Sequence, residues 1–351
     1  MTEDDLRAAV AAGHITEAQA VSVLTLAQSR AGQRATMTGD DEPFELFKGF
    51  AEIFISVGLV IVLGGMLGLA VILQSVLGLA AIGAGVAALL ALYFTRKRRM
   101  TLPSIVLTTA FWMAATIGVS GWMVGTLDAI PSKSDVLVTG ALVVAALGAW
   151  YWAFRVPFTM FLIGLSSLAT LLMYISATAP ITAYMNWQVL FDLGTGSTLA
   201  QGTFWFGIIA FIAGMAFDMR DPHRLGRFAA SAFWLHLLAA PALVNTVAMT
   251  FLNRDDGLGY GLLGVALVLI TLLALIIDRR SFLTAGITYF IVLLTWLVDP
   301  VEQEGVTNAL LVIAVGAFIT ATGAFWSKWR SAILRALPDF PLKDRLAPYA
   351  Q

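Results

Sequence analysis

His236 is the titratable side chain that lies deepest in an apolar stretch of this sequence, Phe233-Trp-Leu-His-Leu-Leu-Ala-Ala-Pro241. If residues 228–251 form a helix, His236 lies about 12 Å from the start of that helix. Pro241 removes one backbone hydrogen bond and bends the same helix, and Asn245 follows further along. These residues predict the wall of a solute cavity or a proton relay. The plainer alternative is a neutral imidazole that hydrogen-bonds to a neighbouring helix.

Two series of polar side chains recur at every fourth residue along other apolar stretches. The first series is Ser104, Thr108, Trp112, Thr116 and Ser120, and the second is Ser166, Thr170 and Tyr174. Such a ridge can form the wet wall of a permeation path. More often it packs helices together, or its hydroxyl groups bond back to carbonyl oxygens of their own helix.

Two short segments place an acid and a base together at the end of an apolar stretch. Asp218 stands next but one to Arg220, and Asp278 precedes Arg279. Both are predicted to be charge pairs at the cytoplasmic ends of helices. Every acid lies in a polar segment or near a helix end. This scarcity of deep charge argues against a proton pump or a strongly ion-coupled carrier.

Several kinds of chemistry have no residues to support them. The chain has no cysteine, and its three histidines are far apart, so neither a metal site nor any cofactor is expected. There is no phosphate-binding glycine loop and no nucleophile elbow, so an enzyme is not expected. The net charge of −1 gives no reason to expect a nucleic-acid partner.

The composition indicates which elements must position these residues. Hydrophobic residues make up 59% of the chain and charged residues 12%, and the mean hydropathy is +0.85. A soluble domain carries roughly twice that share of charge, so much of the apolar surface must face lipid. About 20 apolar residues span a bilayer as a helix. Ten such segments are predicted: 50–73, 76–95, 102–125, 135–153, 157–178, 202–217, 228–251, 258–277, 282–298 and 307–326.

The distribution of Lys and Arg predicts the orientation of these segments. With the N-terminus inside and ten crossings, only Lys133 and Arg254 fall outside, and the other 19 of the 21 basic residues fall inside. Basic residues favour the cytoplasmic side of a membrane. The fold class is therefore predicted to be all-α: a polytopic transmembrane bundle in a bacterial inner membrane, with both termini in the cytoplasm.

The flanking segments complete the predicted domains. Residues 1–35 are expected to form a cytoplasmic helical hairpin, because Thr16 and Gln19 match the capping-box spacing at a helix start. It resembles a DNA-binding helix-turn-helix but lacks a basic face. Residues 36–49 read as an acidic linker that leads into the ten-span domain, 50–326. Residues 327–351 read as an amphipathic tail that continues from the last span and bends along lipid headgroups, or as a plain stop-transfer tail.

Three sequence segments carry a resemblance to a known family. They are Gly13-His-Ile-Thr-Glu-Ala-Gln19, the His236 stretch quoted above, and Ala336-Leu-Pro-Asp-Phe-Pro-Leu-Lys-Asp-Arg-Leu-Ala-Pro348. Together they resemble predicted bacterial multi-span membrane proteins grouped under a domain of unknown function. The resemblance covers most of the chain. It implies a membrane location and a many-span architecture, and it implies no activity and no functional residues.

Two functions follow as hypotheses. The first is a permease-like protein for a small uncharged or weakly charged solute, with His236, Asn245 and the Ser104–Ser120 ridge near the path. The second is a membrane scaffold that recruits a cytoplasmic protein through its N-terminal hairpin. The apolar outer segment 179–201 is either a lid or an interfacial helix. The sequence does not indicate an oligomeric state.

Overall fold

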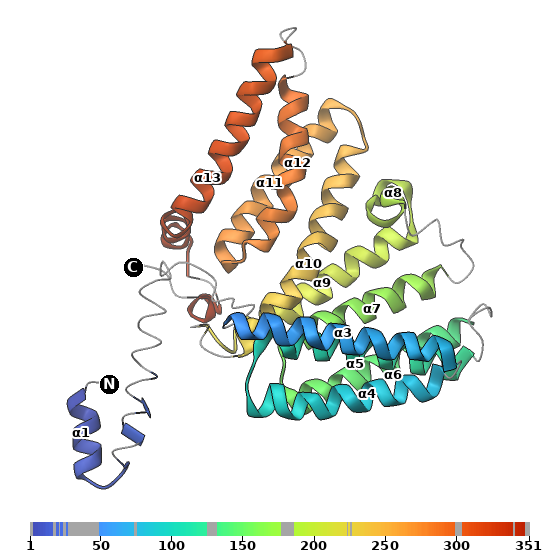
Figure 1. Cartoon of the computed structure of the whole chain (residues 1–351). Helices are drawn as coiled ribbons and strands as arrows, with labels where there is room; N and C mark the ends of the chain where they lie inside the picture. Colours follow the sequence, from blue (N-terminus) through green and yellow to red (C-terminus); the bar gives the residue numbers. More distant parts are fainter. Residues whose placement is uncertain are drawn as a thin grey trace. The chain divides into compact units, whose positions relative to one another are not determined.

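A computed structural model shows a helical protein (Figure 1), and its described residues contain helices and no strand. The all-α class is therefore confirmed for that part of the chain. The described residues are 3–16, 19–20, 22–23, 26, 49–73, 76–124, 132–176, 186–222, 224, 227–298, 304–339 and 341–347.

Each of the ten predicted apolar segments coincides with a long helix. The helices are α3 (Phe50–Leu73), α4 (Val76–Ala91), α5 (Thr101–Val124), α6 (Lys133–Phe154), α7 (Thr159–Ile175), α9 (Thr198–Asp218), α10 (Arg227–Leu252), α11 (Gly257–Ile277), α12 (Ser281–Val298) and α13 (Glu304–Ala336). A π-helical segment, Leu92–Lys97, extends α4. The largest difference is in α13, which continues well beyond the predicted end at residue 326.

Six of the described helices are long and apolar enough to cross a membrane. They are Leu77–Lys97, Thr101–Met123, Lys133–Phe154, Thr198–Asp218, Arg227–Leu252 and Gly257–Ile277. Three further apolar helical stretches are shorter: Phe50–Met66, Thr159–Ile175 and Ser281–Leu293. Several apolar helices are compatible with a membrane location. Ten crossings and the orientation of the termini stay predictions.

Residues 1–44 form a compact unit separate from residues 45–351. Helix α1 spans Glu3–Ala11, and Gly13 follows in the left-handed region with φ of 72°. The predicted capping box is present: the Thr16 N–H donates to Gln19 Oε1 at 2.9 Å, and the Gln19 N–H donates to Thr16 Oγ1 at 3.2 Å. Most of the predicted second helix and linker lies outside the described residues.

Within residues 45–351 the long helices form two groups, each with its own apolar core. Helices α3 to α7, here the N-terminal bundle, pack α5 against α3, α4 and α6, and α6 against α7. Helices α9 to α13, here the C-terminal bundle, pack α10 against α9, α11 and α12, and α13 against α11 and α12. Helix α7 contacts both α9 and α10 and so joins the two bundles.

Many large apolar side chains point away from both cores. Phe54 is 70% exposed, Ile61 69% and Trp152 80%. Contiguous apolar surface of this kind is uncommon in soluble monomers and normal where lipid is the solvent. The exposed side chains therefore support a membrane location.

The first part of the tail is helical, because α13 continues through residue 327 to Ala336. The tail then folds back: the Lys343 Nζ donates to the Leu337 carbonyl at 2.9 Å, and an Arg330 Nη2–H donates to the Ala347 carbonyl. Leu342 makes the turn in the left-handed region, with φ of 72°. The last described residues are thus held against α13.

Candidate functional site

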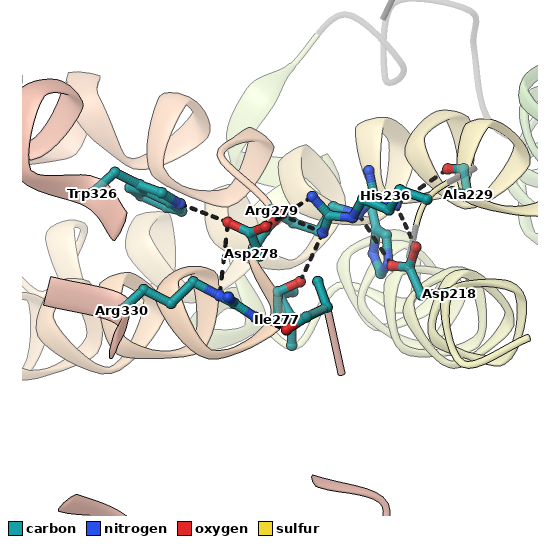
Figure 2. A network of polar contacts seen from close by, with 10 residues as sticks. Asp218, Ala229, His236, Ile277, Asp278, Arg279, Trp326 and Arg330 are labelled. Carbon is teal, nitrogen blue, oxygen red and sulfur yellow. Dashed lines mark hydrogen bonds and ion pairs between the residues drawn. The ribbon is translucent and has the colours of Figure 1, made fainter. Parts of the chain in front are cut away.

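Asp218, His236 and Arg279 form the most buried charged cluster of the C-terminal bundle (Figure 2). His236 Nε2 lies 3.0 Å from Asp218 Oδ2. Arg279 donates hydrogen bonds to both carboxylate oxygens of Asp218, from Nε to Oδ2 at 3.1 Å and from Nη2 to Oδ1. The side chain of His236 is 0% exposed, that of Arg279 3% and that of Asp218 13%.

The ring of His236 packs against the backbone of the neighbouring helix α9. Gly214 stands one turn before Asp218 on α9, and a Cβ at Gly214 would lie 2.8 Å from the imidazole Cε1. Only glycine leaves room for the ring there. Phe211 and Phe282 pack edge-on against the imidazole, with ring centroids 5.6 and 5.9 Å away. The imidazole therefore sits in an apolar slot with one polar side, which faces Asp218.

Asp278 is the second carboxylate of the region and ends α11. It adopts the left-handed conformation at the helix C-cap, with φ of 56°. Its Oδ1 accepts from the Trp326 indole N–H at 2.7 Å, and its Oδ2 accepts from Arg224 Nη1 at 2.9 Å. Arg330 Nε lies 3.8 Å from Oδ1 as an ion pair. Asp278 thereby ties α11, α13 and the α9–α10 loop together.

Backbone carbonyls complete the coordination of two arginines. Arg224 Nη2 donates to the Ile277 and Asp278 carbonyls at 3.3 and 2.8 Å. These carbonyls belong to a helix end, where partners within the helix run out and a positive charge is favourable. Arg279 Nη2 also donates to the Ala229 carbonyl of α10 at 3.2 Å (Figure 2).

The polar groups are here called the charge network: Asp218, Arg224, His236, Asp278, Arg279, Trp326 and Arg330. Its three arginines exceed its two aspartates by one positive charge when His236 is neutral. Two further charges lie beside the network and line the same pocket: Asp221, which accepts from the Ala229 N–H at 3.4 Å, and Arg345, so together they leave this small net charge unchanged. Burying charge costs several kcal/mol per ion unless partners compensate. Most of the compensation here comes from residues distant in sequence.

The acid and the base that are close in the sequence do not bind each other in the structure. Asp218 does not pair with Arg220, whose guanidinium lies over the Phe217 ring at 6.0 Å from its centroid. Nor does Asp278 pair with Arg279. The pairs are crossed: Arg279 binds Asp218, and Arg224 binds Asp278. Side chains one or two residues apart on a helix point in different directions. An acid and a base that are close in the sequence are therefore not necessarily close in space.

Pro241 and Asn245 lie on the same helix as His236 but take no described part in its cluster. Pro241 is inside α10, is exposed and does not end the helix. Asn245 is half-buried, and at 1.5 Å per residue it is about 13 Å along the axis from His236. Their predicted place along a solute path stays a prediction.

The hydroxyl ridges of α5 and α7 make packing contacts. Thr108 donates to the Ser104 carbonyl at 2.7 Å and accepts from the Trp150 indole N–H at 3.1 Å. The Trp112 indole donates to Ser166 Oγ at 2.8 Å, which joins the two ridges. Ser104 bonds back to the Met100 carbonyl, and Thr170 bonds back to the Ser166 carbonyl at 2.7 Å. This is the commoner of the two roles predicted for such ridges.

The remaining ridge residues differ among themselves. Thr170 fills the notch of Gly140 on α6, where any Cβ would collide with it. Tyr174 is 37% exposed, and Lys133 Nζ lies 5.4 Å from its ring centroid. Thr116 Oγ1 is buried without a hydrogen bond. None of these described contacts brings the ridges to His236.

Two buried carboxylates were not singled out as site candidates by the sequence. Glu52 is 5% exposed, and its Oε2 accepts hydrogen bonds from the N–H groups of Thr101 and Leu102 at 3.1 Å each. It therefore caps the start of α5. The sequence feature that could have drawn attention to Glu52 is a single acid in the first turn of an otherwise apolar segment.

Asp192 is also 5% exposed and follows the short helix α8 (Trp187–Phe191). It belongs to the outer segment 179–201, which is predicted to be either a lid or an interfacial helix. Its Oδ2 accepts from Asn253 Nδ2 at 2.8 Å. The next residue, Leu193, donates its N–H to Thr250 Oγ1 at 3.0 Å. This segment is therefore fastened to the end of α10 opposite to the charge network.

A small pocket opens beside Asp218. Its volume is about 10 Å³, which is room for roughly one water molecule. It is lined by Met215, Asp218, Asp221, Pro222, Arg224, Ile277, Arg345, Leu346 and Ala347. The last three residues belong to the folded-back tail, which therefore forms one wall of the pocket.

Among the described residues no group of three or more His, Asp or Glu side chains could hold a metal ion. Comparisons of the chain with protein-family models, curated proteins and solved structures found no match. The fold and the site define an all-helical chain with several membrane-compatible helices and a buried charge network that joins α9 to α13. The resemblance to a family of unknown function stays a prediction.

Proposed function

We propose that this chain is a multi-pass inner-membrane protein of the permease type, which handles a small uncharged or weakly charged solute. The observation that supports this proposal is the Asp218–His236–Arg279 cluster, buried among apolar helices. Ionisable groups are costly in a membrane and, where they occur, usually mark a solute or proton path.

Stability alone is a weak reason to retain such a cluster. A buried ion pair often contributes no more than well-packed apolar residues of similar volume, because desolvation offsets the attraction. The three residues come from α9, α10 and the turn before α12. A cluster that links three elements and can be released by moving one arginine is suited to a gate.

The proposed membrane orientation places this gate on the cytoplasmic side. With ten crossings and both termini inside, the α9–α10 and α11–α12 connections face the cytoplasm, together with the basic clusters that support that orientation. The Asp192 segment then lies at the opposite face. The small net charge of the network favours a solute without a strong net charge.

A flux measurement tests this proposal. The full chain is reconstituted in phospholipid vesicles, and the rate of osmotic swelling is followed with glycerol and with urea as probes. The protein is expected to raise the swelling rate for at least one probe, and His236→Ala is expected to abolish that increase. His14→Ala is the matched control, because His14 is exposed in the separate N-terminal unit. Equal swelling rates for wild type and His236→Ala would contradict the proposal.

A second candidate function is a scaffold that recruits a cytoplasmic protein. Residues 1–44 form a separate unit, and the Thr16–Gln19 capping box begins a helix there, which favours an independent binding module. A pull-down with the full chain, compared with a chain that lacks residues 1–35, tests this function. Binding that survives the deletion would contradict it.

A further inference from the structure

The two ring nitrogens of His236 have different surroundings. Nε2 lies 3.0 Å from the Asp218 carboxylate, whereas Nδ1 is buried without a hydrogen-bond partner. An unsatisfied buried polar atom costs about 1–3 kcal/mol, and so it needs an explanation. Phe211, Phe282 and the Gly214 backbone enclose this part of the ring.

The partners of Asp218 determine which nitrogen carries the proton. Arg279 donates to both carboxylate oxygens, which favours the ionised form. An ionised carboxylate only accepts hydrogen bonds, so the proton of the neutral imidazole is on Nε2 and points to Asp218. The lone pair is then on Nδ1, which is the position that a second proton can take.

We propose that His236 and Asp218 form a proton-binding site beside the pocket walled by residues 345–347. One proton from the aqueous phase binds to neutral imidazole and gives imidazolium, with Asp218 as its counter-ion. This inference rests on the proposed function, because it makes the flux through the permease depend on protons.

Asp218 connects this site to the pocket. Its side chain is 13% exposed and lines the pocket together with Asp221, whereas that of His236 is 0% exposed. A pocket with room for about one water can supply a proton only to the groups that line it. The pocket therefore brings water to Asp218, on the Nε2 side of the ring, and the imidazole must turn within its slot before the lone pair of Nδ1 can take a proton from that side.

Protonation changes the balance of the cluster. Asp218, neutral His236 and Arg279 sum to zero, and the bound proton makes the sum +1. Imidazolium and guanidinium then share a single carboxylate, and their repulsion weakens the Arg279–Asp218 contact. Of the other described charged groups nearby, Arg224, Asp278 and Arg330 are one contact further away and paired with each other, and Asp221 and Arg345 line the pocket next to Asp218. The predicted result is release of α9 from the turn before α12.

Nitrogen NMR of histidine tests the inference without any flux measurement. The full chain has three histidines, so ¹⁵N-histidine labelling in phospholipid vesicles gives three imidazole signals. His14→Gln and His223→Gln assign the remaining one to His236. At pH 8 we expect one protonated and one bare nitrogen in His236, and at pH 5 we expect two protonated nitrogens. A single protonation state from pH 5 to pH 8 would overturn the inference.

Two variants test the role of the neighbours. Asp218→Asn removes the counter-ion and is expected to lower the proton affinity of His236 at least tenfold, since a charge at hydrogen-bond distance is worth more than 1.4 kcal/mol. Arg279→Gln removes the competing cation and is expected to raise the protonated fraction at a given pH. If Asp218→Asn does not fold, the titrations of wild type and of Arg279→Gln still test whether His236 binds a proton. Equal titration in wild type and Arg279→Gln contradicts the proposed competition.

The NMR result and the flux result can fail separately. If His236 titrates as described and no probe crosses the membrane, the permease function fails and the proton site stands. If a probe crosses at the same rate from pH 5 to pH 8 and His236 never changes state, the function stands and the proton site fails.

Discussion

The two bundles satisfy their buried polar groups in different ways. In the N-terminal bundle the contacts between side chains of neighbouring helices are neutral where Trp150 donates to Thr108 and Trp112 donates to Ser166, and the buried carboxylate of Glu52 is bound by backbone N–H groups of α5. In the C-terminal bundle they are ionic, with Arg279 on Asp218 and Arg224 on Asp278. Both bundles present apolar surface of the kind expected to face lipid.

This difference separates packing from function. A buried hydroxyl that bonds back to its own helix costs little and can be replaced with little loss. A buried charge needs its partner, and removing one partner leaves the other uncompensated. The N-terminal bundle therefore resembles a frame, and the C-terminal bundle contains the part that can switch.

The largest effect is expected from Asp218→Asn. The substitution leaves the Arg279 guanidinium, 3% exposed, without its carboxylate. We expect a loss of about 3–5 kcal/mol in the free energy of unfolding, measured by detergent-induced denaturation in mixed micelles. Asp339→Asn is the matched control, because the side chain of Asp339 is fully exposed. A loss at Asp218 no larger than at Asp339 would contradict the importance of the pair.

A smaller effect is expected from Gly214→Ala. The new methyl group would lie 2.8 Å from the His236 ring and force the ring to move, which typically costs about 1–3 kcal/mol. Gly148→Ala on α6 is the control: it meets no atom within 4 Å, and alanine favours the helix. Denaturation of both variants checks the prediction. A Gly214→Ala protein as stable as the control would show that the ring has room.

In the N-terminal bundle Thr108→Val removes the acceptor of the Trp150 indole while keeping the side-chain shape. Hydrogen bonds between membrane helices average about 0.6 kcal/mol, so we expect a loss of roughly that size in the free energy of unfolding. Thr109→Val is the control, because Thr109 bonds to the Ile105 carbonyl of its own helix. A loss as large as that of Asp218→Asn would erase the contrast between the bundles.

The smallest effect is expected at Asp256, which caps the start of α11. A hydrogen bond from Arg254 and the Gly259 N–H hold the pKa of this exposed carboxyl below its usual value. Its contribution is therefore present above the unfolded-state pKa of about 3.9 and is lost as the pH falls through the folded-state pKa. Unfolding followed from pH 6 downward should show a shallower acid limb in Asp256→Asn. An unchanged acid limb would contradict the assignment.

Much of the fold could be predicted because lipid imposes a simple rule on sequence. A spanning helix must be apolar over about 20 residues, and this pattern gave the bounds of α3, α5 and α11 to within a residue. Helix α13 extends past residue 326, the predicted end of the last span, because a helix with a polar surface can continue beyond the apolar segment. The number of crossings and their orientation stay predictions.

The site could be predicted only in part. His236, Asp218 and Arg279 were each singled out, but His236 was assigned to a different group from the other two. Asp218 and Arg279 are 61 residues apart, and no local spacing indicates such a partner. The left-handed turn at Asp278 redirects the chain and brings Arg279 back toward α9. Gly214 was missed because a helical glycine has no pattern that indicates the ring packed against it.

The most direct test replaces the whole cluster with apolar residues, in a chain with Asp218→Leu, His236→Leu and Arg279→Met. If the cluster is retained for function, the triple variant unfolds within about 1 kcal/mol of wild type, or at a higher free energy, because no charge is left stranded. The same vesicles should then show only the swelling rate of protein-free vesicles. A variant that transports glycerol or urea like wild type, or that loses more than about 3 kcal/mol of stability, would contradict the account.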